Sequence, residues 1–283
     1  MNPISVNELT ESVNSNLPRD IKSTIAKNIL AEEKDSDVAK NIFSELINDL
    51  SSKTQREVVN ATGTVLHTNL GRSPNNISFS GSYTNVEYDL KTLSRGTRNE
   101  YLSVLMNNLL GSKDISFVNN NASSLFLSLK SISKSHNIQN VIISRGEIIE
   151  IGGSYRLPEI INETGLNLVE IGTTNKTKLS DYRKALEKYP NSLILKVHRS
   201  NFSINGFTED VSIEELAELK NKFDVFLFHD LGSGLVIDKK FLEINNISIF
   251  KDEPFVQDSL SDGANLVMFS GDKLFGSVQS GMI

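Results

Sequence analysis

One lysine of this chain stands in a setting that suits covalent chemistry. Lys273 lies in a glycine-flanked segment, residues 270–276, directly after the apolar run 265–269. A lysine held against backbone at a strand end is shielded from water, and burial disfavours its ammonium form, which leaves a free amine able to attack a carbonyl. Such an amine forms a Schiff base with pyridoxal 5'-phosphate (PLP). Taken alone, the same motif also fits a solvated surface lysine.

A carboxylate follows a second apolar run. Asp230 comes directly after residues 225–229 and is followed by Leu231-Gly232-Ser233-Gly234. A carboxylate at a buried strand end needs a positive partner, and the protonated pyridine nitrogen of PLP is such a partner. An aspartate at one strand end and a lysine at the next is the pattern of fold-type I PLP enzymes. The alternative is an aspartate that caps the following turn.

Small polar residues at a change from strand to helix predict an anion site. Asn121, Ala122 and Ser123 follow the expected strand 115–118, and the N–H groups and dipole at a helix N-terminus favour a phosphate. Ser270 stands three residues before Lys273 and is placed to help hold that phosphate. The structural alternatives are an ordinary helix cap and a turn serine.

Four further polar residues are candidates for binding. His198 and Asn201 follow the apolar run 193–197, and either is a candidate hydrogen-bond partner for the phenolic oxygen of PLP. The alternative for His198 is a structural histidine. Arg95 and Arg98 precede an expected helix, and their planar guanidinium groups suit phosphate or carboxylate. Solvated loop arginines are the alternative for this pair.

These residues require a scaffold of alternating strands and helices. The chain from residue 57 onward shows this alternation, and its strands are continuously apolar, which favours an α/β fold with a mostly parallel sheet covered on both faces. Sites in such sheets lie at the carboxyl ends of the strands. The expected strands are 115–118, 141–144, 168–171, 193–197, 225–229 and 266–269. The expected helices are 100–110, 122–131, 181–189, 213–221 and 255–260.

The preceding segment has a different character. Residues 1–55 read as helices, one opened by Pro18 and one spanning about 36–50, with residues 51–55 as a linker to the larger domain, residues 56–283. The net charge of −6 argues against a globally basic nucleic-acid binder but not against a local basic patch. Cysteine is absent and the four histidines have no metal-ligand spacing, so neither disulfides nor a metal site is expected. No apolar run approaches a membrane span and no signal peptide is visible, which favours a cytoplasmic protein.

Several longer segments, taken together and in order, resemble bacterial selenocysteine synthase, the L-seryl-tRNA(Sec) selenium transferase family. The resemblance covers essentially the whole chain. The matching segments are residues 60–72, 87–90, 95–98, 144–147, 150–158, 169–175, 196–198, 230–234 and 270–273.

The resemblance implies a fold-type I large domain with PLP attached to Lys273, and a helical N-terminal domain that grips tRNA. It also implies a ring of dimers as the assembly. The implied reaction converts seryl-tRNA(Sec) to selenocysteinyl-tRNA(Sec) with selenophosphate, by way of a dehydroalanyl-tRNA. Within that reaction Asp272 is a candidate for steering proton transfer, and Arg95 and Arg98 are candidates for binding the selenium donor or the tRNA end.

The chain also departs from the family. Members of the family continue well past the lysine, whereas this sequence stops ten residues after it, at Ile283. We therefore expect an incomplete large domain without the C-terminal small domain. An end within a strand predicts unpaired backbone edges, poor stability and loss of activity for the chain alone. Two alternatives are a related PLP lyase acting on a small amino acid and an inactive product that keeps only binding surfaces.

Overall fold

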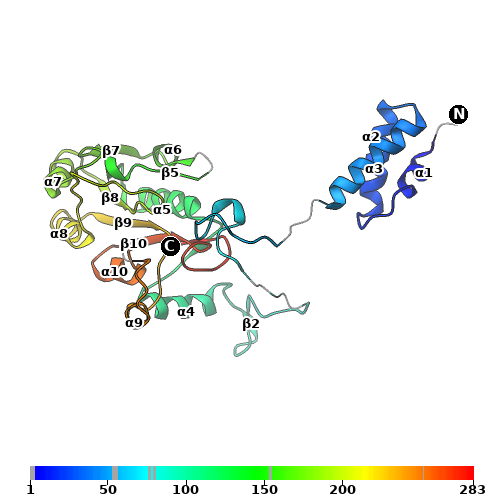
Figure 1. Cartoon of the computed structure of the whole chain (residues 1–283). Helices are drawn as coiled ribbons and strands as arrows, with labels where there is room; N and C mark the ends of the chain where they lie inside the picture. The colour runs from blue at the N-terminus through cyan, green and yellow to red at the C-terminus, as the bar shows by residue number, and fades with distance from the viewer. Residues whose placement is uncertain (1–3, 53–56, 76–77, 79–80, 153–154, 251) are drawn as a thin grey trace. The chain divides into compact units, whose positions relative to one another are not determined.

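The computed structural model describes residues 4–52, 57–75, 78, 81–152, 155–250 and 252–283 (Figure 1). The chain divides into two compact units, Met1–Gly63 and Thr64–Ile283. Within the linker expected at residues 51–55, Ser51 and Ser52 instead end a helix, and residues 53–55 lie outside the described part of the chain.

The first unit packs three helices around a small core. They are α1 (Val6–Glu11), α2 (Arg19–Glu32) and α3 (Ser36–Ser52). Pro18 precedes α2 as expected, whereas the short α1 was not predicted; it begins with a capping box in which Ser5 and Glu8 satisfy each other's backbone N–H groups. The buried apolar residues of the unit are Leu9, Ala26, Phe43 and Ile47.

The second unit is built on a seven-stranded sheet with the strand order β3-β11-β10-β9-β8-β4-β7. All the pairings from β10 to β7 are parallel, and only β11 runs against its two neighbours. The prediction of a mostly parallel sheet is therefore confirmed. The strands are β3 (Phe117–Val118), β4 (Asn140–Ser144), β7 (Asn167–Ile171), β8 (Ser192–Val197), β9 (Phe226–Gly232), β10 (Leu266–Ser270) and β11 (Gly281–Met282).

Helices and two small hairpins surround this sheet. The hairpins are β1 (Tyr88–Asp89) with β2 (Ser94–Arg95), and β5 (Glu150–Ile151) with β6 (Tyr155–Arg156). The five predicted helices are present with small changes of their ends, and α6 and α9 are additional. The helices are α4 (Glu100–Leu110), α5 (Asn121–His136), α6 (Leu157–Glu163), α7 (Leu179–Lys188), α8 (Ile213–Phe223), α9 (Lys239–Ile244) and α10 (Val256–Ser261).

Successive strand residues face opposite sides of the sheet and enter two separate cores. Ile194 and Leu227 join the core formed with α4, α7, α8 and α10. Leu195 and Phe228 join the core formed with α5 and α6. This alternation fixes the side of the sheet on which each residue at a strand end emerges.

The last strand corrects one expectation from the sequence. Rather than presenting an unpaired backbone edge, β11 pairs with both β10 and β3, and Ile283 exchanges two backbone hydrogen bonds with Ser116. Gly281 is needed there, since a Cβ at this position would collide with the Asn120 carbonyl at the start of α5. The close approach of β11 to α5 thus depends on a glycine.

Among the described residues, no helix is both long enough and apolar enough to traverse a bilayer.

Candidate active site

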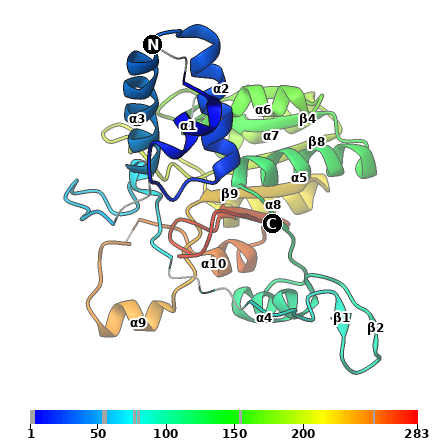
Figure 2. The same ribbon diagram turned by 90° about the vertical axis from the view of Figure 1, so that its right-hand side faces the viewer.

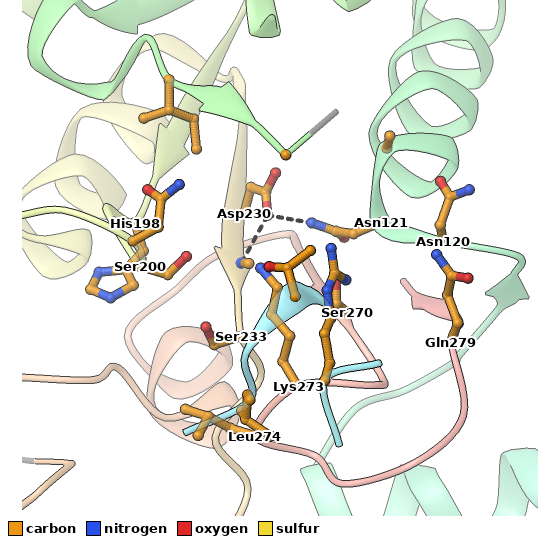
Figure 3. Close-up of a pocket in the computed structure, with 18 of the residues that line it drawn as sticks. Asn120, Asn121, His198, Ser200, Asp230, Ser233, Ser270, Lys273, Leu274 and Gln279 are labelled. Carbon is orange, nitrogen blue, oxygen red and sulfur yellow. Dashed lines mark hydrogen bonds between the residues drawn. The ribbon is translucent and has the colours of Figure 1, made fainter. Parts of the chain in front are cut away.

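Lys273 lies in the turn after β10, and neighbouring backbone groups hold this turn in place. The Leu274 N–H donates to the Ser233 carbonyl at 3.1 Å, and the Gly271 N–H donates to the Ser280 carbonyl at 2.8 Å. Figure 3 shows the Lys273 side chain extending toward Asp230. The lysine that the sequence singles out therefore points into the space at the carboxyl ends of β9 and β10.

The surroundings of Lys273 favour its neutral amine. Burial lowers the pKa of Lys273, and the nearby positive charge of Arg72 lowers it further. The carboxylates of Asp230, Asp272 and Glu253 act in the opposite direction, but the net shift is downward. The amine is thus more available as a nucleophile or base than that of a surface lysine.

Asp230 is a buried carboxylate with one oxygen in use. Its Oδ1 accepts hydrogen bonds from Asn121 Nδ2 at 2.8 Å and from the Gly232 N–H at 3.0 Å. Burial raises the pKa of Asp230, although these two donors and the charge of Lys273 oppose the rise. Within the described parts of the chain Oδ2 receives no hydrogen bond. A cationic or N–H-bearing ligand atom would stabilise the ionised carboxylate there.

The N-terminus of α5 forms another wall of the site. Asn120 caps the helix, with its side chain accepting from the Ser123 N–H at 2.8 Å. The cavity is lined by Asn121, Ala122 and Ser123 of this helix and by Ser270 of β10. Ser270 lies on the same side of β10 as the residue that pairs with Asp230 in the strand register. First-turn N–H groups have no acceptor within their helix, so this wall suits an anion.

A cavity of about 1560 Å³ joins these groups, and several of its polar atoms have no protein partner in the described structure. The buried Oδ1 of Asn121 is one of them. Buried polar groups are normally hydrogen-bonded, so this arrangement suits a ligand. That ligand would present a carbonyl to Lys273, a cationic or N–H atom to Asp230 and an anionic group to α5. Other cavity-lining side chains that make no hydrogen bond to described residues are Ser200, Ser233, Ser270 and Gln279.

His198 lines this cavity, but its ring does not face Lys273. The strand register pairs Val197 with Asp230, so His198 emerges on the opposite side of the sheet from Asp230. Its Nε2 lies 3.3 Å from Glu253 Oε2, and Figure 3 shows the imidazole directed away from Lys273. Its main-chain N–H donates to the Asp230 carbonyl at 2.8 Å. Asn201 also lines the cavity.

Asp272 forms an ion pair with Arg72. No spacing in the sequence indicated that these two residues would meet. Arg72 Nη1 lies 3.2 Å from both carboxylate oxygens of Asp272, and the Ser73 N–H donates to the Asp272 carbonyl at 3.0 Å. Arg72 lines the cavity, whereas the pair partner Asp272 does not. Glu253 is a second cavity residue that sequence reasoning missed. Neither position carries a local signal, because their partners are distant in the chain.

Arg95 and Arg98 lie outside the cavity formed by this chain. Both pair with Glu87, at 3.6 Å for Arg95 and 2.9 Å for Arg98, and their side chains are 85% and 70% exposed. Figure 2 shows the hairpin of β1 and β2, which carries Arg95, next to α4. The structure does not bring these two arginines together with Lys273.

The parallel sheet, the buried aspartate on β9 and the lysine after β10 define the large-domain fold of fold-type I PLP-dependent enzymes. The solved structure of D-glucosaminate-6-phosphate ammonia-lyase has a similar fold, with a TM-score of 0.50, 16% sequence identity and coverage of 65% of this chain and 46% of that chain. The family model for L-seryl-tRNA selenium transferase matches residues 58–283. The chain belongs to this family.

Curated relatives show the same relationship at higher identity. The L-seryl-tRNA(Sec) selenium transferase of Campylobacter fetus subsp. fetus is 41% identical over 275 residues, which cover 93% of this chain and 60% of the relative. That of Aquifex aeolicus is 43% identical over 244 residues, covering 84% of this chain and 52% of the relative. The chain thus spans about 60% of the length of the first of these relatives.

The Arg72 charge gives a testable effect on the lysine. Arg72→Met removes a cation that lowers the pKa of Lys273, so we expect the pKa to rise and the lysine to become reactive only at higher pH. Competitive acetylation of cofactor-free protein over a pH series, read by peptide mass spectrometry, measures this midpoint. Arg98→Met is the matched control, since Arg98 pairs with Glu87 outside the cavity. An unchanged midpoint in Arg72→Met would contradict the assigned cause.

Proposed function

We propose that this chain carries the PLP-binding site of a selenium transferase that converts seryl-tRNA(Sec) to selenocysteinyl-tRNA(Sec) with selenophosphate. The observation that carries the proposal is that three features meet at one cavity. They are Lys273, whose pKa is lowered, Asp230, whose Oδ1 accepts hydrogen bonds, and the N-terminus of α5. Membership of the L-seryl-tRNA selenium transferase family supports the substrate class. Because that substrate belongs to translation, we place the reaction in the cytoplasm.

The residues present fit PLP. Lys273 would hold the cofactor covalently. Asp230 Oδ2, which accepts from none of the described residues, would meet its ring nitrogen, while Asn121 fixes the other oxygen. The first turn of α5 and the hydroxyl of Ser270 would hold its phosphate. When bound, PLP withdraws electrons from the α-carbon of an attached amino acid and makes its α-proton acidic.

The chain's own groups supply the proton transfers. The Lys273 amine, whose pKa is lowered by burial and by Arg72, is the base placed to accept the α-proton of the seryl group. Asp230, kept ionised by a cationic partner, would maintain the electron demand of the cofactor ring. Asp272 fixes Arg72 at the cavity wall through two 3.2 Å contacts. A steering role for Asp272 in proton transfer would then act through this arginine.

A pyridoxal adduct tests the central residue. We expect borohydride reduction of the PLP-loaded chain to trap the cofactor on the peptide containing Lys273, because among the described lysines it is the one that combines burial with a place at the cavity. Lys273→Ala should abolish the adduct, and the exposed Lys113→Ala should leave it unchanged. Mass spectrometry of the digested protein gives the position. An adduct on another lysine, or none, would refute the proposal.

The unit Met1–Gly63 is proposed to bind tRNA, as the family resemblance implies. Support comes from its own helical core, which lets it act as a separate module. Its exposed cations partly pair with nearby acids, as Arg19 does with Glu11 and Lys40 with Asp37. A tRNA contact there would therefore involve a local surface rather than the net charge of the unit.

The substrate class can be separated from that of a small-molecule lyase. We expect the chain to bind seryl-tRNA(Sec) at least about tenfold more tightly than free serine, because phosphate contacts contribute most of the affinity for nucleic acids. Deletion of residues 1–63 should reduce this preference while PLP binding persists. Filter binding for the tRNA and calorimetry for serine measure the two affinities. Equal affinities in the intact chain would favour the lyase.

The ring of dimers is proposed from an exposed apolar helix face. On α4, Tyr101 is 77% exposed, Val104 57% and Leu105 49%, which is unusual for a face that meets only water. Assembly through this face would bring the segment between β1 and α4, which carries Arg95 and Arg98, to another subunit. We expect sedimentation at micromolar concentration to show a dimer or a larger species. A monomer would contradict the proposed assembly.

A further inference from the structure

Ser200 is a cavity residue to which the sequence assigns no role. It follows β8, where its N–H donates to the His198 carbonyl at 3.0 Å. Its side chain lines the cavity and makes no hydrogen bond to any residue in the described ranges. The hydroxyl is therefore a free donor and acceptor at the site.

Gly232 shows how near this hydroxyl lies to the reactive groups. A Cβ built on Gly232 would lie 2.9 Å from Ser200 Oγ and 3.8 Å from Lys273 Nζ. The N–H of the same glycine donates to Asp230 Oδ1 at 3.0 Å. The hydroxyl, the amine and the carboxylate thus surround one residue, whose φ of +66° and lack of a side chain keep the space between them open.

The strand order determines which side of the site each group occupies. Ser200 follows β8, on one flank of β9 and β10. The α5 N-terminus follows β3, on the other flank, with β11 between β3 and β10. Figure 3 shows the same separation, with Ser200 on one side of Lys273 and Asn120 and Gln279 on the other.

The covalent structure of PLP matches this division. Its phenolic oxygen and its phosphate arm stand on the two ring carbons that flank the one carrying the aldehyde. With the aldehyde at Lys273 and the phosphate toward α5, the phenolic oxygen must face the β8 flank. His198 does not fill that place, because the strand register directs its ring toward Glu253.

We propose that the Ser200 hydroxyl donates a hydrogen bond to the phenolic oxygen of the bound cofactor, and that His198 is held outside this contact by Glu253. The inference rests on the proposed PLP site and adds to it the residue that recognises this oxygen. The contact is charge-assisted, because the phenolic oxygen is ionised when the imine nitrogen carries its proton.

A pair of cofactors tests the contact without reference to activity. Equilibrium dialysis would measure the dissociation constants of the full chain for PLP and for its 3-deoxy analogue, which lacks the phenolic oxygen. We expect Ser200→Ala to weaken PLP binding about tenfold and to leave the analogue nearly unchanged, as one charge-assisted hydrogen bond is lost. Unchanged affinity for the analogue would also show that the variant keeps its folded site.

Matched variants give the opposing outcomes. Ser203→Ala alters an exposed serine three residues away and should leave both affinities as in the unmodified chain, as should His198→Asn. Loss of PLP preference in His198→Asn but not in Ser200→Ala would overturn the inference in favour of the histidine. Equal behaviour of Ser200→Ala and the unmodified chain would also overturn it. Failure of the unmodified chain to bind PLP would instead remove the proposed function.

Discussion

The burial of the Asp230 carboxylate is the constraint on which the site depends. A carboxylate at 2% exposure is costly unless a positive or hydrogen-bonding partner offsets its lost hydration. Asn121 and the Gly232 N–H provide part of that compensation, yet burial still raises the pKa of Asp230. The other carboxylate oxygen receives no hydrogen bond from the described residues, which leaves it available to a ligand. Burial, together with the charge of Arg72, lowers the pKa of Lys273, so the pKa values of the acid and the amine shift toward each other.

Strand alternation determines which residues can share that site. Asp230 and Ser270 emerge on the side of the sheet covered by α5, whereas Lys196 and His198 emerge on the other side. Because the sheet is parallel around β9, the carboxyl ends of β8, β9 and β10 open onto one cavity. The antiparallel β11 then fills the gap between β10 and β3, which places the α5 N-terminus beside the turn that carries Lys273.

Much of this arrangement could be predicted from the sequence, because it follows from local patterns. Continuous apolar runs predicted the central strands. The polar residues that follow these runs pointed to Lys273, Asp230 and the start of α5. The Arg72–Asp272 pair could not be found in this way, since 200 residues separate its members and neither sits in a periodic pattern. The antiparallel strand β11 was missed because two residues carry no periodicity. Counting alternation from Val197 would also have predicted that His198 emerges on the side of the sheet opposite Asp230.

A second buried pair holds the end of β8, the strand that His198 and Ser200 follow. Glu147 is fully buried and accepts from Lys196 Nζ at 2.6 Å and from the Val197 N–H at 3.0 Å. Burial raises its pKa to about 7, against the effect of Lys196. Lys196 also reaches Asp210, which in turn holds Arg199. Each residue from 196 to 199 thus has a partner, whereas the Ser200 side chain makes no hydrogen bond to the described residues.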